Sequence, residues 1–212
     1  MNAIRVKICG ITSVADAQIA VKAGADAIGL VFYERSPRAV SIEQARAIAA
    51  SVGPFVTVVG LFVDAEKFFV QDVLANVALH LLQFHGDESL EYCETFQRPY
   101  VKAIRMRPEL DVLNAINAYP SAVGILLDAY LPGIPGGTGE TFDWQRVPTH
   151  ASHPIVLAGG LTAENVALAI RSTQVNGLDS VYGVDVSGGV ESAPGKKDPN
   201  KVEQFIHNAR NT

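Results

Sequence analysis

The sequence predicts an α/β protein in which eight strands close into a barrel. Eight apolar, strand-like runs alternate with helix-like segments along the 212 residues, as in parallel strands joined by right-handed crossovers. The runs begin near residues 4, 27, 57, 79, 100, 123, 155 and 180. Eight repeats favour a (β/α)8 TIM barrel, with a doubly wound open sheet as the alternative. No linker divides the chain, so we expect one barrel domain over residues 1–212.

The first strand ends on a thiol. Residues 4–9 alternate and contain β-branched side chains, which predicts a strand with Arg5, Lys7 and Cys9 on one face. Gly10 follows and lets the backbone turn. Because parallel barrels place their chemistry at the carboxyl ends of the strands, Cys9 is a candidate site residue.

Apolar runs predict the other strands, and caps with helical periodicity predict the helices. We expect Val14 and Val21 to face the core in a first helix over residues 14–26, ended by Gly24, and we expect Ser41 and Thr162 to cap later helices. The remaining predicted strands cover residues 27–32, 57–63, 79–86, 100–105, 123–128, 155–160 and 180–187. The remaining predicted helices cover residues 41–52, 65–76, 87–97, 108–118, 143–147, 163–172 and 199–210, with long loops over 129–142 and 188–198.

Composition excludes several classes of protein. The net charge of −5 argues against nucleic acid as the main partner. Two cysteines, Cys9 and Cys93, give neither a metal-binding spacing nor a disulfide framework. The amino terminus lacks the apolar segment of a signal peptide, and no stretch of about 18 apolar residues predicts a membrane span. We therefore expect a cytoplasmic protein with no membrane partner.

Chemistry-bearing residues gather at the predicted carboxyl ends of the strands, and each has a structural alternative. Cys9 is either a catalytic thiol or a small buried apolar residue. Asp128 shares the inward face of its strand with Leu126 and is either functional or a loop cap. His85 fits a site role and a loop role equally well. Lys7 fits a Schiff base less well than an ion pair inside the barrel.

Two glycine runs predict a phosphate site. Gly159 and Gly160 end the seventh strand before a helix, and Ser187, Gly188 and Gly189 follow the eighth. Glycines let backbone N–H groups approach an anion, and barrels often hold phosphate between these two loops. We also assign Gly137 and Gly139, in the loop after the sixth strand, to phosphate binding. A phosphorylated small molecule is therefore the expected ligand.

Seven motifs, spread from the first strand to the last loop, resemble the signatures of phosphoribosylanthranilate isomerase. In chain order they read VKICGIT, SPRAV, LLQFHG, ILLDA, GGTGETFDW, LAGGLTAENV and GVDVSGGVE. The resemblance implies a (β/α)8 fold and the Amadori rearrangement of N-(5-phosphoribosyl)anthranilate to 1-(2-carboxyphenylamino)-1-deoxyribulose 5-phosphate, a step of tryptophan biosynthesis. It implies no metal or organic cofactor, because the iminium nitrogen accepts the electrons.

The resemblance also assigns roles to single residues. Cys9 falls on the family's general base, Asp128 on its general acid and Arg38 on its carboxylate-binding arginine. His85 is expected near the site, and no proton transfer is assigned to it. Asp185 resembles the family's aspartate on the eighth strand. Gly188 departs from the family's serine, which removes a hydroxyl and keeps the N–H group.

Other functions stay open at this stage. Indole-3-glycerol-phosphate synthase shares the scaffold but needs a catalytic lysine with glutamates, which Lys7 fits poorly. A phosphate-binding module without catalysis would make the pairing of Cys9 with Asp128 accidental. A bifunctional isomerase that also serves histidine synthesis usually has an aspartate where Cys9 stands. The sequence allows a monomer or a homodimer.

Overall fold

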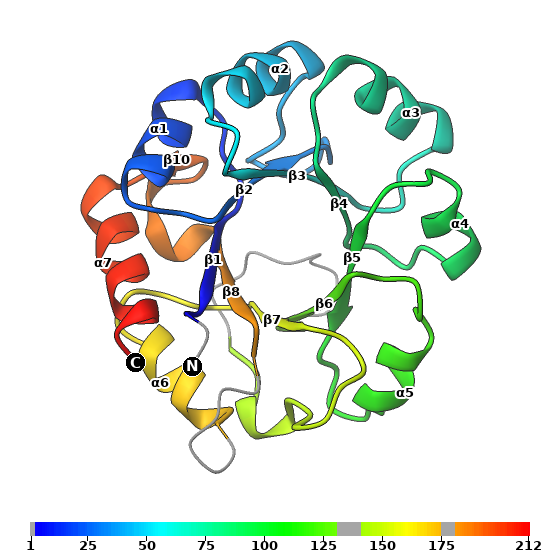
Figure 1. The fold of residues 1–212 in the computed structure, drawn as a ribbon, viewed down its shortest axis with the longest axis vertical. Coiled ribbons are helices and arrows are strands. Elements are labelled where there is room, and N and C mark those ends of the chain that lie inside the picture. The colour runs from blue at the N-terminus through cyan, green and yellow to red at the C-terminus, as the bar shows by residue number, and fades with distance from the viewer. Residues whose placement is uncertain (1–2, 131–140, 175–180) are drawn as a thin grey trace.

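The computed structural model describes residues 3–130, 141–174 and 181–212, and its strands form one closed parallel barrel in chain order. Helices surround the barrel as a ring (Figure 1). The (β/α)8 prediction is therefore confirmed, and the open sheet is excluded because β1 pairs with both β2 and β8. Within the described ranges, no helix is both long and apolar enough to cross a membrane.

The strands follow the predicted order and are mostly shorter than predicted. They are Arg5–Ile8 (β1), Ala27–Val31 (β2), Thr57–Phe62 (β3), Leu81–Phe84 (β4), Tyr100–Arg105 (β5), Gly124–Asp128 (β6), Ile155–Leu157 (β7) and Gly183–Val186 (β8). The helices are Val14–Lys22 (α1), Ile42–Ser51 (α2), Lys67–Asn76 (α3), Leu90–Glu94 (α4), Val112–Asn117 (α5), Val166–Ser172 (α6) and Pro199–Arg210 (α7), and a 3-10 turn spans Trp144–Arg146.

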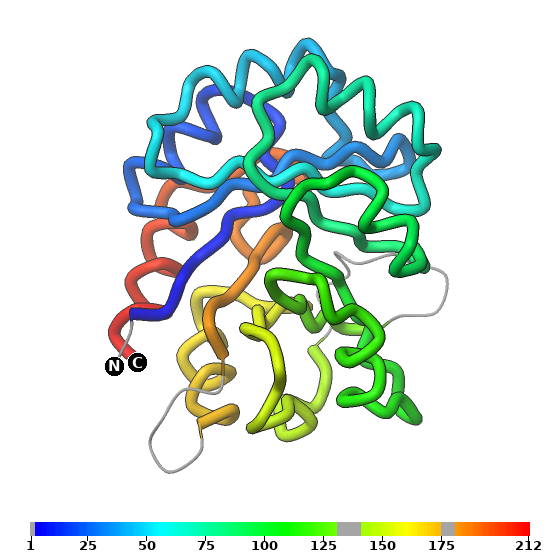
Figure 2. Tube along the Cα trace, turned by 45° about the vertical axis from the view of Figure 1, so that its right-hand side comes forward, coloured from blue at the N-terminus to red at the C-terminus, as the bar shows by residue number. Residues whose placement is uncertain are grey.

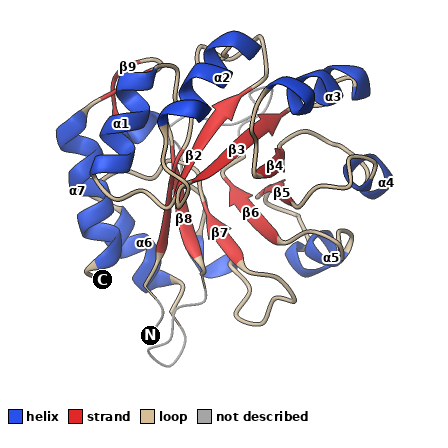
Figure 3. Cartoon of the chain, turned by 45° about the horizontal axis from the view of Figure 1, so that its top comes forward, coloured by secondary structure: helices blue, strands red, loops and turns tan. Residues whose placement is uncertain are grey.

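The strands are buried on both faces, and alternation decides what each face contacts. Along β2, Ile28 and Leu30 point outward into the main core under the helices, whereas Gly29 and Val31 point toward the barrel axis. Figure 3 shows the strands enclosed by helices. Side chains that face the axis near the carboxyl ends of the strands are therefore brought together from distant parts of the sequence.

Local capping explains where several helices begin and end. Ser41 and Gln44 form a reciprocal capping box at the start of α2. Asp198 accepts two backbone hydrogen bonds ahead of Pro199 and so starts α7. Gly24 follows α1 with a φ of +94° and ends it, as predicted.

Some predicted boundaries were wrong, and neighbouring contacts explain two of them. The helix expected over residues 87–97 shrinks to α4 because Glu88 instead accepts hydrogen bonds from the backbone N–H groups of Asp64 and Gly86. Thr162 does not cap α6, since Asn165 bonds the preceding turn and the helix begins after it. Val14 is exposed rather than buried.

The stretch predicted as a loop over residues 188–198 contains regular secondary structure. It contains a 3-10 turn, Gly188–Val190, and an antiparallel hairpin whose strands are Glu191–Ala193 (β9) and Lys196–Lys197 (β10). These strands are too short to give a period-two signal. The helix α7 follows directly and packs beside α1 and α6, and it also contacts β1, so the last helix lies next to the first strand (Figure 2).

An aromatic cluster holds the outer face of β3 to β5 against the helices. Phe84 lies at its centre, with its ring centroid 5.7 Å from those of Tyr92, Phe96 and Tyr100. Phe84 is fully buried, whereas Phe55 is 97% exposed. The two phenylalanines therefore provide a buried residue and a matched surface control.

We predict that Phe84→Ala lowers the free energy of unfolding by about 3–5 kcal/mol, because it removes buried apolar area and leaves a cavity. Phe55→Ala should change it by less than about 0.5 kcal/mol. The shift of the urea midpoint at constant slope measures both effects. Equal shifts for the two variants would contradict the assignment of this cluster to the core.

Candidate active site

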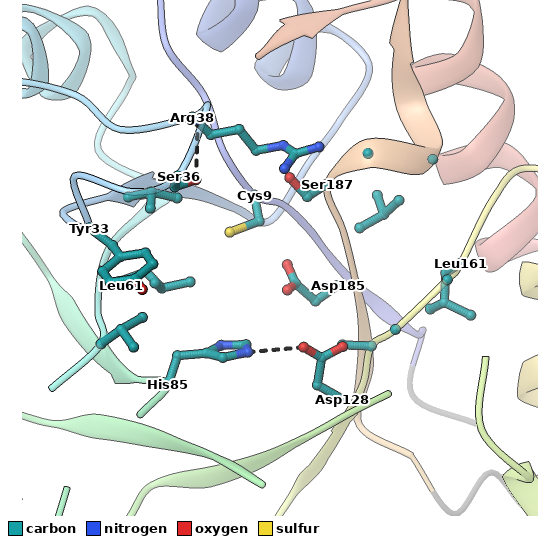
Figure 4. A pocket seen from close by; sticks show the side chains of 18 of the residues that line it. Cys9, Tyr33, Ser36, Arg38, Leu61, His85, Asp128, Leu161, Asp185 and Ser187 are labelled. Atoms are coloured by element: carbon teal, nitrogen blue, oxygen red, sulfur yellow. Dashed lines mark hydrogen bonds and ion pairs between the residues drawn. The ribbon is translucent and has the colours of Figure 1, made fainter. Parts of the chain in front are cut away.

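A cavity of about 320 Å³ opens at the carboxyl end of the barrel. In Figure 4, His85 and Asp128 lie along one side, Arg38 and Ser187 lie along the other, and Cys9 and Asp185 lie between them. The predicted site residues that line it are Cys9, Arg38, His85, Asp128, Gly159, Gly160, Asp185, Ser187, Gly188 and Gly189. Gly137 and Gly139 lie outside the described residues.

Cys9 follows β1, where a backbone hydrogen bond holds it and a glycine on β2 leaves space for its side chain. Its N–H donates to the carbonyl of Val186 at 2.8 Å. A Cβ atom on Gly29 would lie 2.7 Å from Cys9 Sγ and 3.2 Å from Lys7 Cε. Glycine at position 29 therefore makes room for the thiol and for the lysine beneath it.

Lys7 forms an ion pair inside the barrel, which is the alternative that the sequence favoured over a Schiff base. Its Nζ lies 2.9 Å from Asp185 Oδ1, and the two residues are in register across β1 and β8. Burial lowers the pKa of Lys7, but the Asp185 carboxylate and the Cys9 sulfur together outweigh burial and raise the pKa above its usual value. A lysine held so firmly in its charged form is a poor Schiff-base nucleophile.

Burial raises the pKa of the Cys9 thiol, and the Asp185 carboxylate adds to the shift. The ammonium groups of Lys7 and Lys197 oppose it without cancelling it. The resting side chain is therefore a neutral thiol at neutral pH, beside two cations that favour the thiolate once the proton leaves.

Asp128 belongs to a buried chain of hydrogen bonds. Its Oδ2 lies 2.9 Å from His85 Nε2, and its Oδ1 accepts from the N–H of Ala129. The Gln83 amide nitrogen lies 2.9 Å from His85 Nδ1. With that amide donating, the imidazole carries its proton on Nε2 and donates to Asp128. His85 thus fixes the carboxyl group in place.

The two glycine runs form one wall of the cavity. Gly159 and Gly160 follow β7 with φ values of +81° and +60°. A side chain on Gly159 would collide with the backbone N of Ala129, so this position also requires close approach of two chain segments. Backbone N–H groups of this kind, in a wall without side chains, suit a phosphate group.

Arg38 has a partner that the sequence analysis missed. Its Nε and Nη2 donate to the two carboxylate oxygens of Glu191, each at 2.8 Å. Lys197 donates to Glu191 Oε1 at 2.8 Å from a fully buried position. Glu191 ends the quoted motif GVDVSGGVE, but the sequence contains no signal that pairs it with a residue 153 positions away.

Three further residues with polar or reactive side chains do not line the cavity. Arg105 does not line it, and its Nη2 donates to the backbone carbonyl of His85. Cys93 is buried in α4, and burial raises its pKa to about 12. His80 accepts a hydrogen bond from the N–H of Val58. These residues therefore have structural roles.

Comparisons with known proteins agree on one family. The model of the N-(5'-phosphoribosyl)anthranilate isomerase family matches residues 6–208. An isomerase of that name from Cellvibrio japonicus is 68% identical over 206 residues, which cover 97% of this chain and 93% of the relative. A crystal structure of phosphoribosyl anthranilate isomerase from Thermotoga maritima superposes with a TM-score of 0.88 at 41% identity, covering 99% of this chain and 100% of that one.

A second solved structure contains a ligand. It is a phosphoribosyl anthranilate isomerase in complex with reduced 1-(o-carboxyphenylamino)-1-deoxyribulose 5-phosphate, with a TM-score of 0.84 and 39% identity. The match covers 99% of this chain and all of that one. The likeness therefore extends over the whole barrel, including every strand that contributes to the cavity.

We predict that iodoacetamide alkylates Cys9 slowly at neutral pH and that the rate rises without a plateau until the pH exceeds about 9, because the thiol pKa is raised. Mass spectrometry of the Cys93→Ala variant measures the rate at a single thiol. A plateau near pH 7 would show that Cys9 is already a thiolate, contrary to this expectation.

Proposed function

Because this chain belongs to the N-(5'-phosphoribosyl)anthranilate isomerase family, we propose that Cys9 and Asp128 make the two proton transfers of the family's reaction. The protein is an isomerase of tryptophan biosynthesis. The reaction opens a furanose ring to a protonated Schiff base and then moves the C2′ proton to give an aminoketose. One group must therefore donate a proton to the ring oxygen, and another must remove one from carbon.

Asp128 suits the acid role. A protonated Asp128 gives its proton to the ring oxygen as the ring opens. The carboxylate left behind accepts hydrogen bonds from His85 Nε2 and from the N–H of Ala129. These two donors stabilise the charge that appears when the proton leaves, and they keep the side chain directed into the cavity.

Cys9 suits the base role. Its sulfur lines the same cavity at the end of β1, and Lys7 and Lys197 lower the cost of the thiolate. The Cys9 thiol first gives its own proton to solvent in the open cavity. The resulting thiolate takes the C2′ proton, and the iminium nitrogen accepts the electrons to give an enolamine. The enolamine then tautomerises to the ketone. Because the nitrogen of the substrate is the electron sink, this chemistry is complete with the chain's own residues.

The rest of the cavity suits the two ends of the substrate. Arg38 supplies a cation for the anthranilate carboxylate, beside an apolar wall of Val31, Tyr33, Leu61 and Val63 that suits the aromatic ring. The glycine runs after β7 and β8 suit the 5-phosphate. The observation that carries the proposal is that Cys9 and Asp128 line one cavity, together with the Arg38 cation and the two glycine runs.

We predict that Cys9→Ala and Asp128→Ala each lower kcat by about 10²- to 10⁴-fold, the usual value of a general acid or base. Loss of anthranilate fluorescence from freshly prepared substrate measures turnover. Urea titrations of both variants control for unfolding. Turnover at the wild-type rate in a folded variant would remove that residue from its role.

For Arg38→Ala, the expected change is an increase in KM with a smaller effect on kcat, because a carboxylate contact binds substrate and transition state alike. The same fluorescence assay at varied substrate concentration measures both constants. Unchanged kinetics would exclude contact between Arg38 and the carboxylate.

A further inference from the structure

The guanidinium of Arg38 is only partly available to a ligand. Two of its N–H groups, on Nε and Nη2, donate to Glu191 in a bidentate pair. The side chains of Arg38 and Glu191 are 14% and 6% exposed. A guanidinium has five N–H donors in a rigid plane, so this pair fixes the direction of the donors that remain.

The β9–β10 hairpin and the residues after it hold Glu191 in place. The β9–β10 hairpin places Lys197 next to Glu191, and the carbonyl of Glu191 accepts from Lys201 Nζ at 2.9 Å. Lys197 Nζ also donates to the carbonyl of Ser187 at 3.1 Å, which ties the hairpin to the loop that ends β8. Replacing a buried ion network by well-packed apolar residues is often neutral for stability, so stability alone does not account for this one.

The side chains of Arg38, Glu191 and Lys197 together carry one net positive charge. Arg38 and Lys197 contribute two cations, and Glu191 contributes one anion whose pKa the two cations hold below its usual value despite burial. Arg38 and Glu191 alone would be neutral and would attract an anion weakly. Lys197 therefore restores the charge that Glu191 cancels.

A second hydrogen-bonding group, the Ser187 hydroxyl, lies next to the Arg38 side chain. Within the described part of the chain, Ser187 Oγ is buried without a hydrogen-bond partner. A Cβ atom on Gly10 would lie 2.7 Å from Ser187 Oγ and 2.5 Å from Arg38 Cδ, so the two side chains are neighbours. Figure 4 shows both at the same side of the cavity.

We propose that Glu191 and Lys197 are positioning residues for the carboxylate subsite. Glu191 directs the free edge of Arg38 toward the aromatic carboxylate of the substrate, and Lys197 keeps the subsite cationic. This inference rests on the proposed contact between Arg38 and that carboxylate. It adds that the hairpin after β8, which is remote in sequence from Arg38, determines how well the subsite recognises its anion.

The test is Glu191→Gln, which removes the charge and keeps the size of the side chain. Competitive inhibition constants are measured for anthranilate, which probes the carboxylate subsite, and for ribose 5-phosphate, which probes the phosphate end. We expect the constant for anthranilate and the KM to rise about tenfold, with kcat and the constant for ribose 5-phosphate within about twofold. If Glu191 were only a competing counterion, its removal would tighten anthranilate binding, and tighter or unchanged binding would overturn the proposal.

Further variants cover misfolding and separate the two proposals. Glu191→Asp keeps the charge on a shorter side chain and should weaken anthranilate binding less, and Lys197→Met should weaken it by lowering the charge. In an Arg38→Ala background, Glu191→Gln should have no further effect. If Arg38→Ala alone leaves anthranilate binding unchanged, the carboxylate contact itself fails.

Asp26→Asn is the matched control, because Asp26 also accepts from two cations, Arg5 and Arg210, at the other end of the barrel. It should leave both inhibition constants unchanged. A loss of anthranilate binding in Asp26→Asn equal to that in Glu191→Gln would indicate a general effect on the fold and would overturn the positioning role.

Discussion

The strands of this barrel are covered on both faces, so the alternation of side chains along each strand decides where every residue can act. Outward residues such as Phe62 and Phe84 join the core under the helices. Inward residues at the carboxyl ends meet around one cavity, which brings Cys9 and Asp128 together from β1 and β6. A shift of one residue in register would exchange these two sets and abolish both core and site.

The charged and polar side chains inside the barrel form separate ion pairs and hydrogen bonds. Lys7 pairs with Asp185, His85 bonds to Asp128, and Arg38 shares Glu191 with Lys197. Each of these interactions fixes the orientation of the side chains that it joins, because a buried polar group must stay hydrogen-bonded. The cavity can therefore present a thiol, a carboxyl group and a cation in set positions before any ligand arrives, which is the preorganisation that proton transfer requires.

The sequence predicted the barrel and most of the cavity because both depend on local patterns. Apolar runs marked the strands, and β5 has the predicted bounds. Strand ends located Cys9, His85 and Asp128. Glu191 and Lys197 were missed because their short hairpin is held by ion pairs to distant residues such as Arg38. The length of α4 and the start of α6 were wrong because Glu88 and Asn165 bond to neighbouring turns instead of extending a helix.

If Cys9 removes the C2′ proton, the loss of an isotope label from that carbon depends on the Cys9 thiol. Substrate carrying deuterium at C2′ is turned over in water, and mass spectrometry follows the deuterium remaining in substrate and product. We expect wild-type enzyme to release the C2′ deuterium as product forms and folded Cys9→Ala to retain it. Release from Cys9→Ala at the wild-type rate would contradict the account and assign the base to another group.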